Sequence, residues 1–172
     1  AVKPVSELKD LKVDQVCIGS CTNSSYLDMM RAARILKGQR VADHVSLVIA
    51  PGSRQVLGML AENGALSDML AAGARLIECA CGPCIGMGQS PATDAVSLRT
   101  FNRNFFGRSG TASANVYLVS PETAAASAIT GVFTDPTTLD YKDPAYKKGL
   151  RLSLLEGKDK RLKKSVILLC KP

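Results

Sequence analysis

Two kinds of apolar pattern alternate along the first 136 residues of the chain. Continuous apolar runs, which suit strands covered on both faces, lie at residues 13–19, 45–50, 75–79 and 115–120. Apolar residues spaced three and four positions apart, as on one face of a helix, lie at residues 29–36, 55–62, 66–72 and 122–130. This alternation predicts an α/β fold with three layers, α/β/α, around a mostly parallel central sheet.

The net charge of +7 is distributed unevenly along the 172 residues. Residues 1–140 contain 12 basic and 12 acidic side chains, whereas residues 141–172 contain 10 basic and 3 acidic ones. We therefore expect one domain over residues 1–140, followed by a basic tail or the start of a linker over 141–172. Such a tail is either solvated or contacts an acidic partner such as nucleic acid.

No apolar run approaches the roughly 20 residues that a membrane-spanning helix needs. Residues 1–11 also lack the apolar core of a signal peptide. We therefore expect a cytoplasmic protein with no membrane partner, in which cysteines stay reduced and serve metal or redox chemistry. Of the six cysteines, Cys17 on a strand is expected to pack in the core, and packing is also favoured for Cys79. Nothing in the sequence around Cys170 indicates a role for it.

The other three cysteines form the candidate site. Cys21 follows the first predicted strand, and Cys81 and Cys84 follow the third, in a Cys-Gly-Pro-Cys turn. Since ligands bind at the carboxyl ends of parallel strands, these loops are expected to converge on one edge of the sheet. Structural zinc and iron–sulfur cubes normally take four protein ligands, so three thiolates leave one metal position open as a Lewis acid.

Polar residues beside these cysteines extend the candidate site. Ser20 and Asn23 are expected to donate hydrogen bonds around the metal ligands. Arg103 and Arg108 lie five positions apart in a glycine-containing loop, and arginine is suited to bidentate capture of a carboxylate. Taken alone, two loop arginines are also compatible with plain surface charges. No obvious general base is present in the chain, so no catalytic residue is assigned.

Four motifs, in this order, resemble the aconitase superfamily: GSCTNS at 19–24, CGPCIG at 81–86, NRNFFGR at 102–108 and SPE at 120–122. The resemblance covers residues 13–136 and is to the third, cluster-binding domain of an aconitate hydratase, which is related to the isopropylmalate dehydratase large subunit. It implies that Cys21, Cys81 and Cys84 bind a [4Fe-4S] cluster whose fourth iron binds substrate. It also implies that Asn102 lies near the cluster and that Arg103 and Arg108 bind substrate carboxylates.

The resemblance implies a hydro-lyase of the tricarboxylic acid cycle that interconverts citrate and isocitrate through cis-aconitate. Family members are several times longer, so we expect a fragment or subunit that is inactive alone and needs the remaining domains in cis or as another subunit. One alternative is an isopropylmalate dehydratase or homoaconitase large subunit, with a dicarboxylate or tricarboxylate substrate. Alternatives of other classes are a thioredoxin-type dithiol and an RNA-binding module when the cluster is absent.

Overall fold

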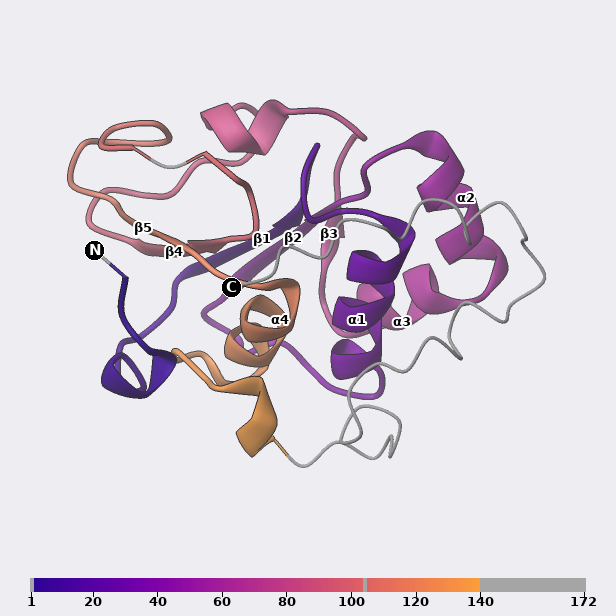
Figure 1. Cartoon of the computed structure of the whole chain (residues 1–172), viewed down its shortest axis with the longest axis horizontal. Helices are drawn as coiled ribbons and strands as arrows, with labels where there is room; N and C mark the ends of the chain where they lie inside the picture. Colours follow the sequence, from indigo (N-terminus) through magenta and orange to yellow (C-terminus); the bar gives the residue numbers. More distant parts are fainter. Residues whose placement is uncertain (1, 104, 140–172) are drawn as a thin grey trace. The chain divides into compact units, whose positions relative to one another are not determined.

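The computed structural model describes residues 2–103 and 105–139 (Figure 1). The predicted basic tail, on which the RNA-binding alternative partly depends, lies outside these residues. Within them, no helix has both the length and the apolar character needed to cross a membrane. The helices and strands are β1 Gln15–Gly19, α1 Tyr26–Leu36, β2 Ser46–Ala50, α2 Arg54–Glu62, α3 Ala65–Ala71, β3 Arg75–Leu76, β4 Val96–Arg99, β5 Asn115–Leu118 and α4 Pro121–Thr130, with 3-10 helices η1 Val5–Glu7, η2 Gly82–Ile85 and η3 Pro136–Thr138.

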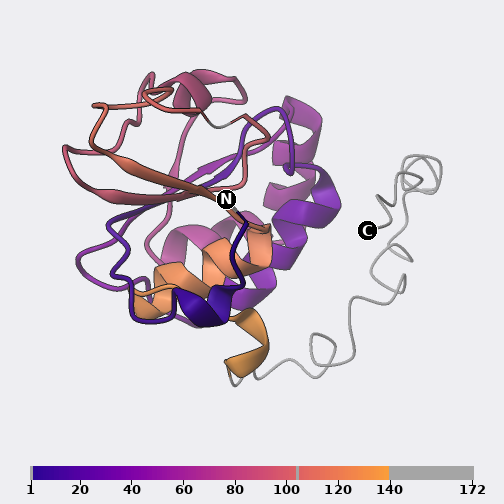
Figure 2. The ribbon, with the colours of Figure 1, turned by 60° about the vertical axis from the view of Figure 1, so that its left-hand side comes forward.

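The five strands form one parallel sheet in the order β3-β2-β1-β4-β5, which confirms the predicted α/β fold. From the central strand β1 the chain first builds outward through β2 to β3, and then crosses over to β4 and β5. Because parallel crossovers are right-handed, connections that run in opposite directions lie on opposite faces of the sheet. The four α-helices accordingly cover one face, and the β3–β4 and β4–β5 connections cover the other (Figures 1 and 2).

The two outer layers differ in kind. Helix α1 packs against α2, α3 and α4, and α4 also packs on β1. Ala124, Ala125, Ala126 and Ala128 of α4 are fully buried, and their small side chains allow this close packing. The layer on the opposite face contains the short helix η2 and otherwise irregular chain. The candidate site residues are concentrated in that second layer and at the adjoining edge of the sheet.

The structure differs from the sequence-based expectations at two strands. β4 at 96–99 was not predicted, because a charged residue, Arg99, interrupts its apolar run. β3 has two residues rather than the five expected at 75–79. The Ile77 amide still donates to the Ile49 carbonyl of β2, and beyond it the chain leaves the sheet and leads to the cysteine turn. The predicted helix boundaries hold more closely, since Ser25 and Ser120 cap α1 and α4 through side-chain hydrogen bonds.

Candidate metal centre

Three loops at the carboxyl edge of the sheet carry the predicted site residues. Cys21 lies two residues beyond the end of β1. Cys81 is the residue before η2, and Cys84 lies within it, on the connection that leaves β3. The loop with Arg103 and Arg108 follows β4, which neighbours β1 in the sheet. Parallel strand direction therefore brings the three loops to one edge, as the sequence pattern predicts.

The thiols of Cys21 and Cys81 are hydrogen-bonded to each other although they are 60 positions apart in the sequence. The hydrogen bond from Cys81 lowers the pKa of Cys21, and hydrogen bonds from Thr22 and Ser20 act in the same direction. The same contact and the charge of Cys21 raise the pKa of Cys81, to which the charge of Cys84 also contributes. The structure thus brings Cys21 and Cys81 into contact, and it places Cys84 close enough to Cys81 to affect its pKa.

Hydrogen bonds hold the loops together next to the cysteines. The Ser20 hydroxyl donates to the Ala80 carbonyl at 3.4 Å, which joins the residues directly before Cys21 and Cys81. The Asn23 side-chain amide donates to the Thr100 carbonyl at 2.6 Å. Ser20 therefore connects the two loops that carry the cysteines, and Asn23 connects the Cys21 loop to the segment after β4. Asn102 is exposed, and its contact with a cluster remains a prediction.

The loop of Cys21 begins at a backbone position that only glycine fits. Gly19 has a φ of +110°, and a Cβ built on it would lie 2.0 Å from the carbonyl oxygen of Ala50 in β2. Its amide donates to the Thr100 hydroxyl at 2.8 Å, and the next amide, of Ser20, donates to the Ala50 carbonyl at 2.7 Å. The close approach between β1 and β2 thus directs the chain from the sheet into the Cys21 loop.

Arg108 reaches the buried cysteine of the turn. Its Nη2 atom lies 3.7 Å from the Sγ of Cys84, and its guanidinium carbon lies 5.2 Å from the centre of the Phe105 ring. Cys84 is only 5% exposed and packs in a buried cluster with Cys17, so Arg108 is an additional contact of its thiol. Arg103 is exposed. Substrate binding by either arginine remains a prediction.

The residues at this edge fit an iron–sulfur cluster in their chemistry. Among residues 2–103 and 105–139, no group of three His, Cys, Asp or Glu is arranged to hold a single metal ion. A [4Fe-4S] cube instead places its cysteine ligands on different irons, so its thiols must surround a larger volume. Two buried polar atoms in the surrounding loops also lack hydrogen-bond partners among these residues: Arg108 Nε and Ser109 Oγ. Unpaired buried polar atoms are costly, and a bound anionic group would satisfy them.

Two residues that support the site escaped the sequence analysis. Thr100 is fully buried and bonds to both Gly19 and Asn23, and Arg99 is buried at 2% exposure beneath the cysteine turn. The sequence did contain a sign that Arg99 is buried. It is the one charged residue in the otherwise uncharged stretch 95–101, which contains Val96, Leu98 and Phe101. Cys17, as predicted, is fully buried in the core, and burial raises its pKa to about 11.

A cavity of about 670 Å³ lies elsewhere, between the N-terminal segment and β5. Its lining includes Val5, Leu8, Tyr117 and Phe133, and none of the predicted site residues. The cavity and the cysteine loops are therefore two different candidate locations for a functional site. We place the functional site at the cysteines, because the cavity contains no cysteine, metal ligand or arginine.

Comparison with known proteins gives consistent matches over most of the chain. A family model described as Aconitase family (aconitate hydratase) matches residues 1–131. The 3-isopropylmalate dehydratase large subunit of Herpetosiphon aurantiacus is 46% identical over 146 residues, which are 84% of this chain and 35% of that protein. The homoaconitase large subunit of Thermus thermophilus is 43% identical over 143 residues, 83% of this chain and 34% of that protein. The chain thus spans about a third of the length of these relatives.

These relatives show that the expectation of an aconitate hydratase was wrong. Proteins 43–46% identical to the chain are named 3-isopropylmalate dehydratase or homoaconitase large subunits, which favours the alternative interpretation. The assignment to the tricarboxylic acid cycle has no support for the same reason. The four motifs could not make this distinction, because the resemblance that they carry is to the superfamily as a whole.

Proposed function

Because the chain belongs to the aconitase family, we propose that it is the cluster-binding part of a 3-isopropylmalate dehydratase large subunit. The observation that carries this proposal is the meeting of Cys21 and Cys81 beside Cys84 at the carboxyl edge of the sheet. The reaction would be the reversible removal of water from a small hydroxy dicarboxylate. A homoaconitase is the second candidate, since one relative of similar identity has that name.

In this proposal Cys21, Cys81 and Cys84 hold a [4Fe-4S] cluster. When bound, the cluster supplies an iron without a protein ligand, a Lewis acid for the departing hydroxyl group. Arg103 and Arg108 bind and orient the substrate carboxylates. Removal of the carbon-bound proton falls to a base from a part of the protein outside this chain, so the chain alone is expected to be inactive.

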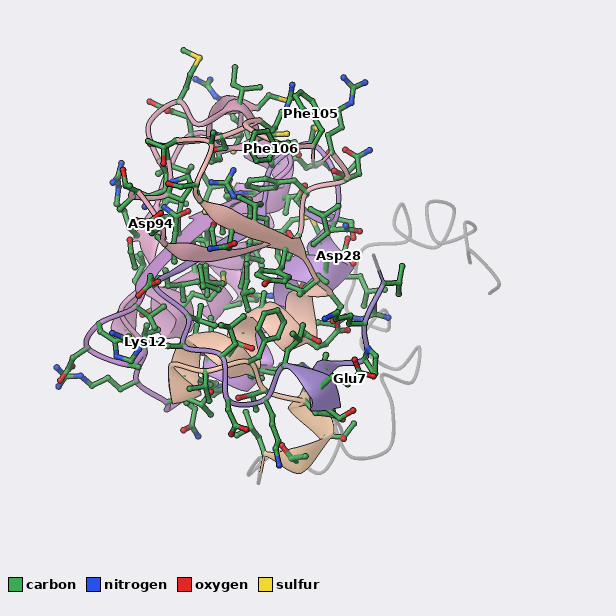
Figure 3. All side chains as sticks on the ribbon, turned by 90° about the vertical axis from the view of Figure 1, so that its left-hand side faces the viewer. Glu7, Lys12, Asp28, Asp94, Phe105 and Phe106 are labelled. Atoms are coloured by element: carbon green, nitrogen blue, oxygen red, sulfur yellow. The ribbon has the colours of Figure 1, made fainter. Side chains whose placement is uncertain are left out.

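Exposed apolar side chains around the candidate site support the need for further protein. Ile85 and Met87 are 44% and 64% exposed, and Phe105 and Phe106 are 61% and 85% exposed. Figure 3 shows Phe105 and Phe106 on the same end of the domain, away from Glu7 and Lys12. Clusters of exposed apolar side chains commonly mark an interface. We propose that they contact the remaining part of the protein, in cis or as another subunit.

Anaerobic reconstitution with iron and sulfide tests the cluster. The parent chain should bind about four irons and gain broad visible absorbance, whereas Cys21→Ser, Cys81→Ser and Cys84→Ser should each lose most of both. Cys79→Ser is the matched control, since it makes the same chemical change in the same segment. Full iron content in Cys21→Ser would contradict the ligand set.

The substrate is tested in the complete protein with its other domains or subunit. Formation of the unsaturated acid is followed with 3-isopropylmalate, homocitrate and citrate under the same conditions. We expect the highest kcat/KM with 3-isopropylmalate. A preference for homocitrate would select the second candidate, and a cluster-loaded enzyme that dehydrates none of them would refute the assignment.

A further inference from the structure

A buried polar network connects the sheet to the cysteine turn. Arg99 of β4 donates from Nη1 to the Pro83 carbonyl at 2.7 Å, from Nε to the Ser97 hydroxyl at 3.1 Å and from Nη2 to Gln15 Oε1 at 3.2 Å. Gln15 in turn donates to the Ser90 carbonyl at 2.9 Å. The network is therefore hydrogen-bonded to the β3–β4 connection at two points, the carbonyls of Pro83 and Ser90.

The guanidinium is buried without a carboxylate. Arg99 is 2% exposed, and no ion pair within residues 2–103 and 105–139 involves it. Its guanidinium carbon lies 5.6 Å from the centre of the Phe101 ring. Burial lowers its pKa, and the nearby Cys17 and Cys84 act in the opposite direction. A buried charge without a partner is costly, which is a reason to look for an anion that it serves.

The two nearby thiols differ as possible anionic partners. Cys17 lies on β1 directly beside Arg99, but burial raises its pKa, which keeps its thiol neutral near pH 7. Cys84 is in the turn whose Pro83 carbonyl Arg99 holds, and it packs with Cys17, Val48 and Phe101 in one buried cluster. The charge of Arg99 thus lies beneath the one proposed ligand that is itself buried.

We propose that Arg99 is a positioning residue of the metal centre, which fixes the Cys81–Cys84 turn through the Pro83 carbonyl and places a buried positive charge beneath Cys84. This inference rests on the proposed function, because the charge is useful there only if Cys84 is a ligand of an anionic cluster. The remaining proposed ligands, Cys21 and Cys81, are exposed free thiols, and they are hydrogen-bonded to each other rather than held by Arg99.

Hydrogen exchange in the metal-free chain tests the positioning. Arg99→Met should accelerate amide exchange in residues 81–87 about tenfold, since hydrogen bonds from a charged donor to the turn are lost. Arg75→Met is the matched control, because the exposed Arg75 also donates to this connection, at Gly88, and its loss should leave exchange in 81–87 unchanged. Wild-type exchange in a folded Arg99→Met chain would overturn the proposal.

The charge is tested in the reconstituted chain by redox titration of the cluster. Arg99→Met should make reduction about tenfold less favourable, a fall of about 59 mV, because the positive charge favours the more negative reduced state. Arg99→Lys keeps the charge and should retain the parent potential, but one ammonium replaces a three-way donor, so exchange in 81–87 should still rise. An unchanged potential in Arg99→Met would overturn the electrostatic part.

The outcomes separate this inference from the proposed function. If the parent chain takes up no cluster, the proposed function fails, whereas hydrogen exchange still decides whether Arg99 positions the turn. If the parent chain takes up the cluster and Arg99→Met matches it in both measurements, only this inference fails. Should Arg99→Met not fold, Arg99→Lys decides: slow exchange like that of the parent overturns the positioning role, and faster exchange supports it.

Discussion

Replacing Gly19 by alanine should destabilise the domain by about 3 kcal/mol. A residue with a side chain at a φ of +110° costs about 1–3 kcal/mol. The new Cβ would lie 2.0 Å from the Ala50 carbonyl oxygen, so β2 would have to move by about 1 Å to reach the 3.0 Å that a Cβ tolerates. That movement also weakens the Ser20 amide hydrogen bond to the same carbonyl, worth about 0.5–1.5 kcal/mol.

Urea unfolding and thermal melting of the parent and variant chains measure this loss. At 172 residues, about 3 kcal/mol corresponds to a fall in Tm of roughly 6–12 °C. Gly38→Ala is the control, because Gly38 also has a positive φ, +68°, but no atom of the described residues lies within 4 Å of the point where its Cβ would stand. It should lose only about 1 kcal/mol. Equal losses in the two variants would refute the argument that the approach of Ala50 dictates glycine at position 19.

Three further predictions concern single side chains. Burial raises the pKa of Cys17 from 9.0 to about 11, so the free energy of unfolding should be at its full value below pH 9 and fall by about 3 kcal/mol as the pH rises through 11. Urea unfolding should show this decrease, and Cys17→Ala should remove it. Thr100→Val leaves the Gly19 amide without its acceptor and should cost about 1–3 kcal/mol in urea unfolding, while Thr100→Ser should stay close to the parent. In the complete protein, Arg103→Lys should raise KM for the dicarboxylate and leave iron content unchanged; an iron-poor variant would show instead that Arg103 is structural.

Most of the fold was predictable because its signals are local. The apolar runs of β1 and β2 and the spaced apolar faces of α1 and α2 follow directly from the sequence. β4 was missed since the burial of Arg99 depends on acceptors 84 and 16 positions away, at Gln15 and Pro83, which no local pattern contains. Between β3 and β4 the described residues form the 3-10 helix η2 rather than an α-helix.

The candidate site was predictable in part for a related reason. The positions of Cys21, Cys81 and Cys84 after strand ends predict that they share one edge, and the structure places them there. The supporting contacts of Ser20 and Thr100 depend on which strands are neighbours, and that order emerges only in the folded sheet. The aconitate hydratase reading was wrong because the four motifs indicated the superfamily, whereas the relatives similar over most of the chain are named 3-isopropylmalate dehydratase or homoaconitase large subunits.

The order of the strands also has a consequence for how the protein matures. Cys21 follows β1 and Cys81 follows β3, and β2 lies between these strands in the sheet. The two sulfurs therefore become neighbours only after three strands that span 62 positions of chain have assembled, from residue 15 to residue 76. Before the sheet forms, Cys81 and Cys84 are close to each other in the chain, whereas Cys21 is 60 positions from Cys81. If the three thiols hold the proposed cluster, they can surround it only once the sheet has formed.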